Sequence, residues 1–181
     1  MRYVLETPRL ILRPIEAADI PVFVPLLNDY AVSAHLARVP HPYTEKDAHD
    51  FLKKMAGSAP SGGDYAFAIV RNNDNAYIGG CGVHPSLGWE IGYWLGRAFW
   101  GQGYASEAVL RLIRFAFEEL GAGKLKAEWF NGNPASGRVL AKLGFMATGE
   151  TMSNALARGH KVPATVVALD RAAFEARNRQ S

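Results

Sequence analysis

One stretch near the middle of the chain constrains the fold most. The apolar run that ends at Leu95 is followed by Gly101-Gln102-Gly103 and then by an amphipathic segment. This order predicts a strand, a loop with two glycines, and a helix. The first amide groups of a helix have no partner inside it, and the helix dipole is positive at that end. The stretch therefore predicts an anion site suited to phosphate oxygens.

Three interpretations of this loop compete. The glycines can simply allow the helix to pack close to the strand. A dinucleotide site needs its third small residue one position after Ala105 and an early βαβ unit, whereas the strands before this loop look antiparallel. A nucleoside-triphosphate loop needs Gly-Lys-Ser/Thr, and Gly103 is followed here by Tyr104.

Hydrophobic periodicity divides the rest of the chain into an α+β order of elements. Strands are expected at 9–13, 65–70, 77–83, 89–95, 124–130, 145–151 and 162–169. Helices are expected at 17–29, 44–56, 106–120 and 134–143, and in a polar tail after Asp170. Thr44 and Asp47 have the spacing of a helix cap. No repeat or linker divides this order, so we expect one domain over residues 1–181.

Composition and charge exclude several classes of protein. The chain has 181 residues and a net charge of +3, with scattered Lys and Arg, which argues against a nucleic-acid partner. No run approaches the ~20 apolar residues of a membrane span, and the N-terminus lacks a signal-peptide pattern, so we expect a cytoplasmic protein without a membrane partner. Cys81 is the only cysteine and the five histidines lack ligand spacing, so we expect no metal.

The loop and the start of the helix read Gly101-Gln102-Gly103-Tyr104-Ala105-Ser106-Glu107-Ala108. This segment resembles the pyrophosphate-binding motif of GNAT acetyltransferases, with Gly103 and Ala105 at its small positions. Trp100 replaces the usual Gln or Arg, as in the branch that acetylates the N-termini of ribosomal proteins. Three further segments resemble that branch in the expected order: Glu6-Thr7-Pro8-Arg9-Leu10-Ile11-Leu12-Arg13, Trp89-Glu90-Ile91-Gly92-Tyr93-Trp94-Leu95 and Asn133-Pro134-Ala135-Ser136-Gly137-Arg138-Val139-Leu140-Ala141-Lys142-Leu143-Gly144-Phe145.

The resemblance implies a GNAT-like fold, with a mixed, mostly antiparallel sheet whose central parallel strands splay apart and are flanked by helices. It implies acetyl-CoA as cosubstrate, lying between strands 89–95 and 124–130. The cosubstrate would contact the backbone of Trp94 and Leu95, with the Leu95 amide near the thioester oxygen. Its pyrophosphate would lie on the amides of Gln102, Gly103, Tyr104, Ala105 and Ser106.

The resemblance also implies roles for two polar residues at the start of the helix 134–143. Asn133 would hydrogen-bond the cosubstrate arm, and Ser136 would protonate the departing thiolate. Many relatives use a tyrosine for that proton, and the matching position here is Leu140. Helix capping is the alternative interpretation for Asn133 and Ser136.

Glu90 is the candidate general base. On a strand it shares one face with Gly92 and Trp94. The other face then holds Trp89, Ile91, Tyr93 and Leu95. A carboxylate among so many apolar residues can accept the amine proton, through water. The alternative is an exposed charge at the start of a strand, and His84 is the next candidate base.

We expect direct attack of a primary amine, from a protein or peptide N-terminus or a small molecule, on the thioester. A non-catalytic acyl-CoA-binding or regulatory domain is the alternative, and the missing tyrosine at position 140 is its best support. Residues 31–64 and 149–162 are expected to line the acceptor side, and their mixed charge selects no acceptor. Whether the chain forms a homodimer stays open.

Overall fold

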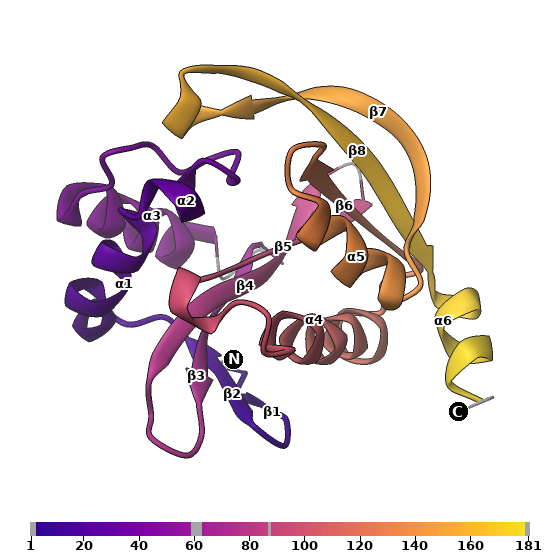
Figure 1. Cartoon of the computed structure of the whole chain (residues 1–181). Helices are drawn as coiled ribbons and strands as arrows, with labels where there is room; N and C mark the ends of the chain where they lie inside the picture. The colour runs from indigo at the N-terminus through magenta and orange to yellow at the C-terminus, as the bar shows by residue number, and fades with distance from the viewer. Residues whose placement is uncertain (1–2, 59–62, 87, 180–181) are drawn as a thin grey trace.

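A computed structural model describes residues 3–58, 63–86 and 88–179. Its centre is a sheet in the order β1-β2-β3-β4-β5-β6-β8-β7 (Figure 1). The strands are β1 (Leu5–Glu6), β2 (Leu10–Pro14), β3 (Tyr65–Arg71), β4 (Tyr77–Ser86), β5 (Gly88–Leu95), β6 (Lys124–Phe130), β7 (Met146–Ala155) and β8 (His160–Asp170). The helices are α1 (Ile20–Leu27), α2 (Tyr30–Ser33), α3 (Glu45–Ser58), α4 (Tyr104–Arg114), α5 (Pro134–Lys142) and α6 (Arg171–Asn178).

The centre of the sheet holds its single parallel pair among the described strands, β5 with β6. These two strands pair at two positions only, Trp89 with Leu125 and Glu90 with Lys126. By contrast, β5 pairs with β4 at eight positions and β6 with β8 at seven. The sheet therefore opens between β5 and β6 toward Leu95 and Phe130, and the predicted mixed α+β fold with splayed parallel strands is confirmed.

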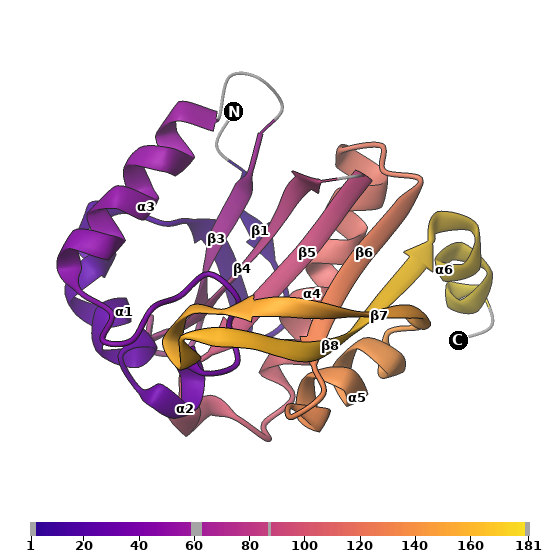
Figure 2. The same cartoon turned by 90° about the horizontal axis from the view of Figure 1, so that it is seen from above.

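Helices cover both faces of the sheet. Alternation along β3 divides its side chains: Phe67 and Ile69 join the core beneath α4, whereas Ala68 and Val70 join the core beneath α1 and α3. Figure 2 shows α1 to α3 grouped apart from α4 and α5. The opening between β5 and β6 thus lies between two helical layers.

The hairpin of β7 and β8 arches away from the sheet toward α2 (Figures 1 and 2). Near its tip, Arg158 donates a hydrogen bond to the carbonyl of Ala34 (2.7 Å). The guanidinium carbon also lies 5.9 Å from the centroid of the Phe130 ring. These contacts attach the tip to the segment after α2 and place the hairpin above the end of β6.

Most predicted elements agree with the structure to within a few residues, and the exceptions have local causes. Helix α4 begins two residues early, at Tyr104, because Gly103 is its N-cap with φ +82°. Strands β7 and β8 extend beyond 151 and before 162 because they pair with each other as far as Ala155 and His160. The short β1 and α2 were not predicted, since two to four residues carry no periodicity.

Two further local features bear on the sequence predictions. The predicted cap of α3 is confirmed, with the Thr44 amide donating to Asp47 Oδ2 (2.9 Å) and the Asp47 amide donating to Thr44 Oγ1 (3.3 Å). Within the described ranges, no helix combines the length and apolar character needed to cross a membrane.

Candidate active site

A cavity of about 1080 Å³ occupies the opening between β5 and β6 and reaches both helical layers. Eight of the ten residues predicted for the site line it: Glu90, Trp94, Leu95, Gly103, Ala105, Ser106, Asn133 and Ser136. The other two, Gln102 and Tyr104, are described but do not line the cavity. The tertiary structure therefore gathers three separate segments of the chain, 90–95, 103–106 and 133–136, around one space.

The pairing of β4 with β5 decides which backbone groups face this space. The Gly96 amide donates to the carbonyl of Ile78 (2.9 Å), and bonded pairs alternate along an antiparallel ladder. Trp94 therefore pairs through its own backbone with Gly80, so its amide and carbonyl point toward β4. The backbone groups of Tyr93 and Leu95 point toward the opening. The Leu95 carbonyl accepts a hydrogen bond from Trp100 Nε1 (2.8 Å), a role for Trp100 that the sequence did not predict.

The glycine loop ends at an exposed helix start. Gly101 and Gly103 have φ of +73° and +82°, conformations that favour glycine. The first backbone hydrogen bond of α4 runs from the Glu107 amide to the Gly103 carbonyl (3.1 Å). The amides of residues 104–106 precede this bond and have no partner within the helix, which is the arrangement that binds phosphate oxygens. The loop therefore fits the pyrophosphate of acetyl-CoA.

The side chains of Gln102 and Tyr104 serve the loop itself. Gln102 Nε2 donates to the carbonyl of Ala98 (2.9 Å), and the Gln102 carbonyl accepts from Arg9 Nη1 (3.1 Å). The Tyr104 ring is buried and lies under the Arg9 guanidinium, 4.5 Å from its carbon to the ring centroid. A contact of either residue with phosphate would come from its backbone amide alone.

The start of α5 places Ser136 beside a tyrosine that the sequence did not single out. Asn133 caps the helix, accepting a hydrogen bond from the Ser136 amide (3.4 Å), as the capping interpretation predicted. The Ser136 hydroxyl lies 2.8 Å from the Tyr93 hydroxyl. Burial raises the pKa of Tyr93 to about 12, although its hydrogen bond with Ser136 acts in the opposite direction. Tyr93 is therefore a protonated phenol at neutral pH.

Leu140, at the position where many relatives have a tyrosine, is a core residue of α5. Its side chain is 1% exposed and belongs to the core beneath α4. The phenol beside Ser136 comes instead from β5, where Tyr93 alternates with Ile91 and Leu95 on the α4 side. This strand alternation was the available signal for Tyr93.

Glu90 lies on the opposite face of the sheet, as its strand alternation predicted. It stands directly across from His84 on β4, with 3.4 Å between Glu90 Oε1 and His84 Nε2. Arg38 Nη2 lies 3.3 Å from the same histidine nitrogen. The side chain of Glu90 is 26% exposed and that of His84 is 18% exposed. The two candidate bases therefore form one partly buried pair in the wall of the cavity.

A second carboxylate, Glu128 on β6, lines the same face. Its Oε1 accepts a hydrogen bond from the hydroxyl of Ser153 (2.7 Å), which is 7% exposed on the inner side of the β7–β8 hairpin. Its neighbour Ala127 joins the core beneath α4, so alternation turns Glu128 toward α1 to α3. Glu128 was not among the predicted site residues, and that alternation along β6 was the available signal.

The predicted acceptor stretches contribute unequally. From 31–64, fourteen described residues line the cavity, among them Arg38, Asp47 and Asp50, while residues 59–62 lie outside the described residues. From 149–162, Leu156 is the lining residue, whereas Arg158 is bound to the segment after α2. Among the described residues 149–162, the hairpin thus lines the cavity through Leu156 alone.

Cys81 has the environment of a core residue. It is 6% exposed and packs in the core beneath α4, although it also reaches the wall of the cavity. Burial raises the pKa of its thiol far above the usual range, so the thiolate needed for nucleophilic attack is not formed at neutral pH. Within the described part of the chain, no group of three His, Cys, Asp or Glu side chains is arranged to hold a metal ion.

Comparison with known proteins identifies the family. Residues 9–146 match the family described as the acetyltransferase (GNAT) domain. The chain belongs to the GNAT acetyltransferase family. It is 31% identical over 163 residues to the uncharacterized N-acetyltransferase p20 of Bacillus licheniformis, an alignment covering 87% of this chain and 90% of p20. This GNAT protein is an acetyl-CoA-dependent acetyltransferase.

Solved structures of the family share the fold. An acetyltransferase of the GNAT family from Bacillus anthracis superposes with a TM-score of 0.80 at 22% identity, covering 93% of this chain and 98% of that one. RimJ of Mycobacterium smegmatis, in complex with CoA-disulfide, superposes with a TM-score of 0.80 at 17% identity, covering 94% and 87%. At these identities the likeness concerns the fold.

Replacing Gly103 by Val tests the phosphate loop. We expect it to abolish detectable CoA binding in isothermal titration while the protein stays folded, because Val is strained at φ +82° and a β-carbon would meet Arg9 Nη2 at 3.3 Å. Gly159→Val is the matched control, since Gly159 has φ +71° on the hairpin with open space around it. Equal CoA affinity in the Gly103 variant and the parent would remove the loop from the site.

Replacing Cys81 by Ala tests for an acyl-enzyme. We expect kcat to stay within about threefold of the parent, because direct attack by the amine needs no enzyme nucleophile. Steady-state kinetics with acetyl-CoA measures it. An acetylated Cys81 that forms and decays as fast as turnover would contradict direct attack.

Proposed function

We propose that this protein transfers the acetyl group of acetyl-CoA directly to a primary amine, of a protein N-terminus or of a small molecule. The observation that carries the proposal is the opening between β5 and β6, which has a phosphate-type loop on the α4 side and the Glu90–His84 pair on the other. The thioester of acetyl-CoA would lie in the opening, with the rest of the cosubstrate on the α4 side. The acceptor amine would approach from the opposite face. We also propose that residues 1–181 form this one domain, because β8 lies within the sheet beyond the matched residues 9–146.

Three sets of residues would hold acetyl-CoA. The amides of residues 102–106 would bind the pyrophosphate, Asn133 would bind the arm, and the backbone of Tyr93 and Leu95 would pair with the pantetheine. The edge groups of β5 support this choice, since the backbone of Trp94 is engaged with β4. The Leu95 amide would stabilise charge on the thioester oxygen.

Glu90 would receive the proton of the attacking amine. An α-amino group with a pKa near ~8 is partly neutral at pH 7, whereas a lysine near ~10.4 costs about 4–5 kcal/mol to deprotonate. Glu90 and His84 are the base candidates for either task, and the α-amino group is the less costly one. The site therefore favours N-termini or small amines of lowered pKa.

Ser136 would supply the proton to the departing thiolate, with Tyr93 behind it. The 2.8 Å contact allows Tyr93, protonated at neutral pH, to donate to the Ser136 oxygen while Ser136 donates to sulfur. A thiol with a pKa near ~8.5 leaves readily as a thiolate, so this assistance is a small part of the barrier. The absence of a tyrosine at position 140 is thus compatible with catalysis.

Release of free CoA in the presence of amines tests the proposal directly. Purified protein is incubated with acetyl-CoA and a panel of peptide N-termini, lysine side-chain analogues and small amines, and thiol release is followed. We expect release that depends on an amine, with mass spectrometry showing the acetylated amine. CoA binding without release for any acceptor would support the non-catalytic alternative.

Replacing Glu90 by Gln tests the base. We expect kcat to fall by roughly 10²-fold or more, the usual range for loss of a general base, with CoA affinity unchanged. Activity should recover partly as pH rises, because the fraction of neutral amine grows without help from the enzyme. Glu150→Gln, on exposed β7, is the control. A Glu90 variant that follows the parent across the pH range would leave His84 as the next residue to test.

Replacing Glu128 by Gln tests whether this carboxylate helps to bind the amine acceptor. Gln keeps an oxygen for the Ser153 hydroxyl and removes the negative charge beside the incoming ammonium. We expect KM for a cationic amine to rise about fivefold, the order of 1 kcal/mol for a partly exposed charge pair, while CoA affinity stays unchanged. Initial rates over a series of amine concentrations measure KM. An unchanged KM would separate Glu128 from acceptor binding.

A further inference from the structure

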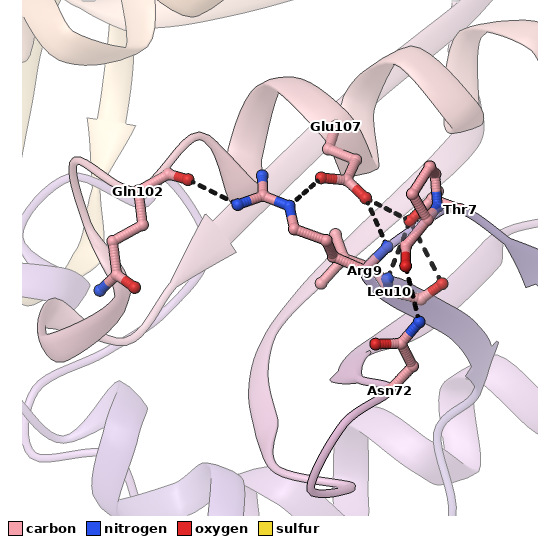
Figure 3. Close-up of polar contacts among 7 residues, drawn as sticks. Thr7, Arg9, Leu10, Asn72, Gln102 and Glu107 are labelled. Atoms are coloured by element: carbon pink, nitrogen blue, oxygen red, sulfur yellow. Dashed lines mark hydrogen bonds and ion pairs between the residues drawn. The ribbon is translucent and has the colours of Figure 1, made fainter.

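The N-terminal segment around Thr7 and Arg9 binds the first turn of α4 (Figure 3). Thr7 Oγ1 donates to Glu107 Oε1 (2.6 Å), and the Arg9 amide donates to the same oxygen (2.9 Å). Arg9 Nε donates to the other oxygen, Oε2 (2.6 Å). Three donors from a segment about a hundred residues earlier in the chain therefore hold one carboxylate.

The same guanidinium also holds the loop that precedes α4. Arg9 Nη1 donates to the Gln102 carbonyl (3.1 Å; Figure 3). The guanidinium also covers the ring of Tyr104. The carbonyl and the N–H of one peptide unit point in opposite directions because the unit is planar and trans. Fixing the Gln102 carbonyl on Arg9 therefore turns the Gly103 N–H away from Arg9. Gly103 lines the cavity.

Glu107 needs this restraint because it is an acid beside an anion site. It lies in the first turn of α4, next to the amides of residues 104–106. Burial alone would raise the pKa of Glu107, but hydrogen bonds from Thr7 and Arg9 lower it, so the carboxylate is charged at neutral pH. Free to rotate, this charge would repel phosphate or bind the loop amides itself. Bound by Thr7 and Arg9, Glu107 does not line the cavity in the described structure.

We infer that Thr7 and Arg9 are positioning residues of the cosubstrate site. They direct the Gln102–Gly103 peptide and hold Glu107 away from the phosphates, so that the loop amides are available for the pyrophosphate. The inference rests on the part of the proposed function that assigns the loop to acetyl-CoA, and it is independent of the acceptor. It predicts that a change on the N-terminal segment weakens CoA binding.

Isothermal titration with CoA tests the inference. We expect Arg9→Gln to raise Kd about tenfold, in the range for loss of a charge-assisted hydrogen-bond network. Arg171→Gln is the matched control, because Arg171 forms a comparable exposed pair with Glu175 (2.7 Å) on α6. Thr7→Val should also raise Kd, whereas Thr7→Ser should keep the parent value because it retains the hydroxyl.

A double variant separates positioning from direct contact with phosphate. If Arg9 acts by restraining Glu107, adding Glu107→Gln to Arg9→Gln should recover part of the lost affinity, because the unrestrained charge is gone. A double variant no tighter than Arg9→Gln would overturn the restraint of Glu107. An unchanged Kd in folded Arg9→Gln, or equal weakening by Arg171→Gln, would overturn the positioning role as a whole. Tight CoA binding without acetyl transfer to any amine would refute the proposed function and leave this inference standing.

Discussion

The separation of β5 from β6 is the constraint on which the rest of the structure depends. Two strands in the middle of a sheet give up most of their mutual hydrogen bonds, and unpaired buried backbone groups are costly. The fold limits this cost by pairing each strand extensively on its other side, eight positions with β4 and seven with β8. Trp100 satisfies the Leu95 carbonyl at the open end. The opening therefore leaves backbone groups of β5 available to an extended ligand.

The sheet divides the chemistry between its two faces. Strand alternation sends Tyr93 to the side of α4 and α5, where it meets Ser136, and sends Glu90 to the side of α1 to α3, where it meets His84. The groups that we propose for the two proton transfers thus stand on opposite sides of one strand. The β7–β8 hairpin contributes Ser153, whose hydroxyl binds Glu128 on the same face as Glu90.

Several features of the candidate site depend on local sequence. Gly101 and Gly103 before an amphipathic segment predict a phosphate-type loop because a left-handed backbone and a helix start are local properties. Alternation along 89–95 places Glu90 and Ile91 on opposite faces, because the direction of successive side chains in a strand is also a local property. The four matching segments indicated the GNAT family, and the comparison with known proteins confirmed it. The Tyr93–Ser136 and Glu128–Ser153 contacts were not predicted, because each joins two elements that lie far apart in the sequence.

By itself, the sequence determined the order of elements, the glycine loop and the face of each residue on its strand, all of which depend on near neighbours in the chain. It also indicated the family, through four segments that match in order. Tertiary structure alone decided where β5 and β6 part, which backbone groups of β5 face the opening, and that Trp94 pairs with Gly80 instead. It also decided that Thr7 and Arg9 bind Glu107 and Gln102. Such contacts join segments about a hundred residues apart, and no local propensity encodes the register that brings them together.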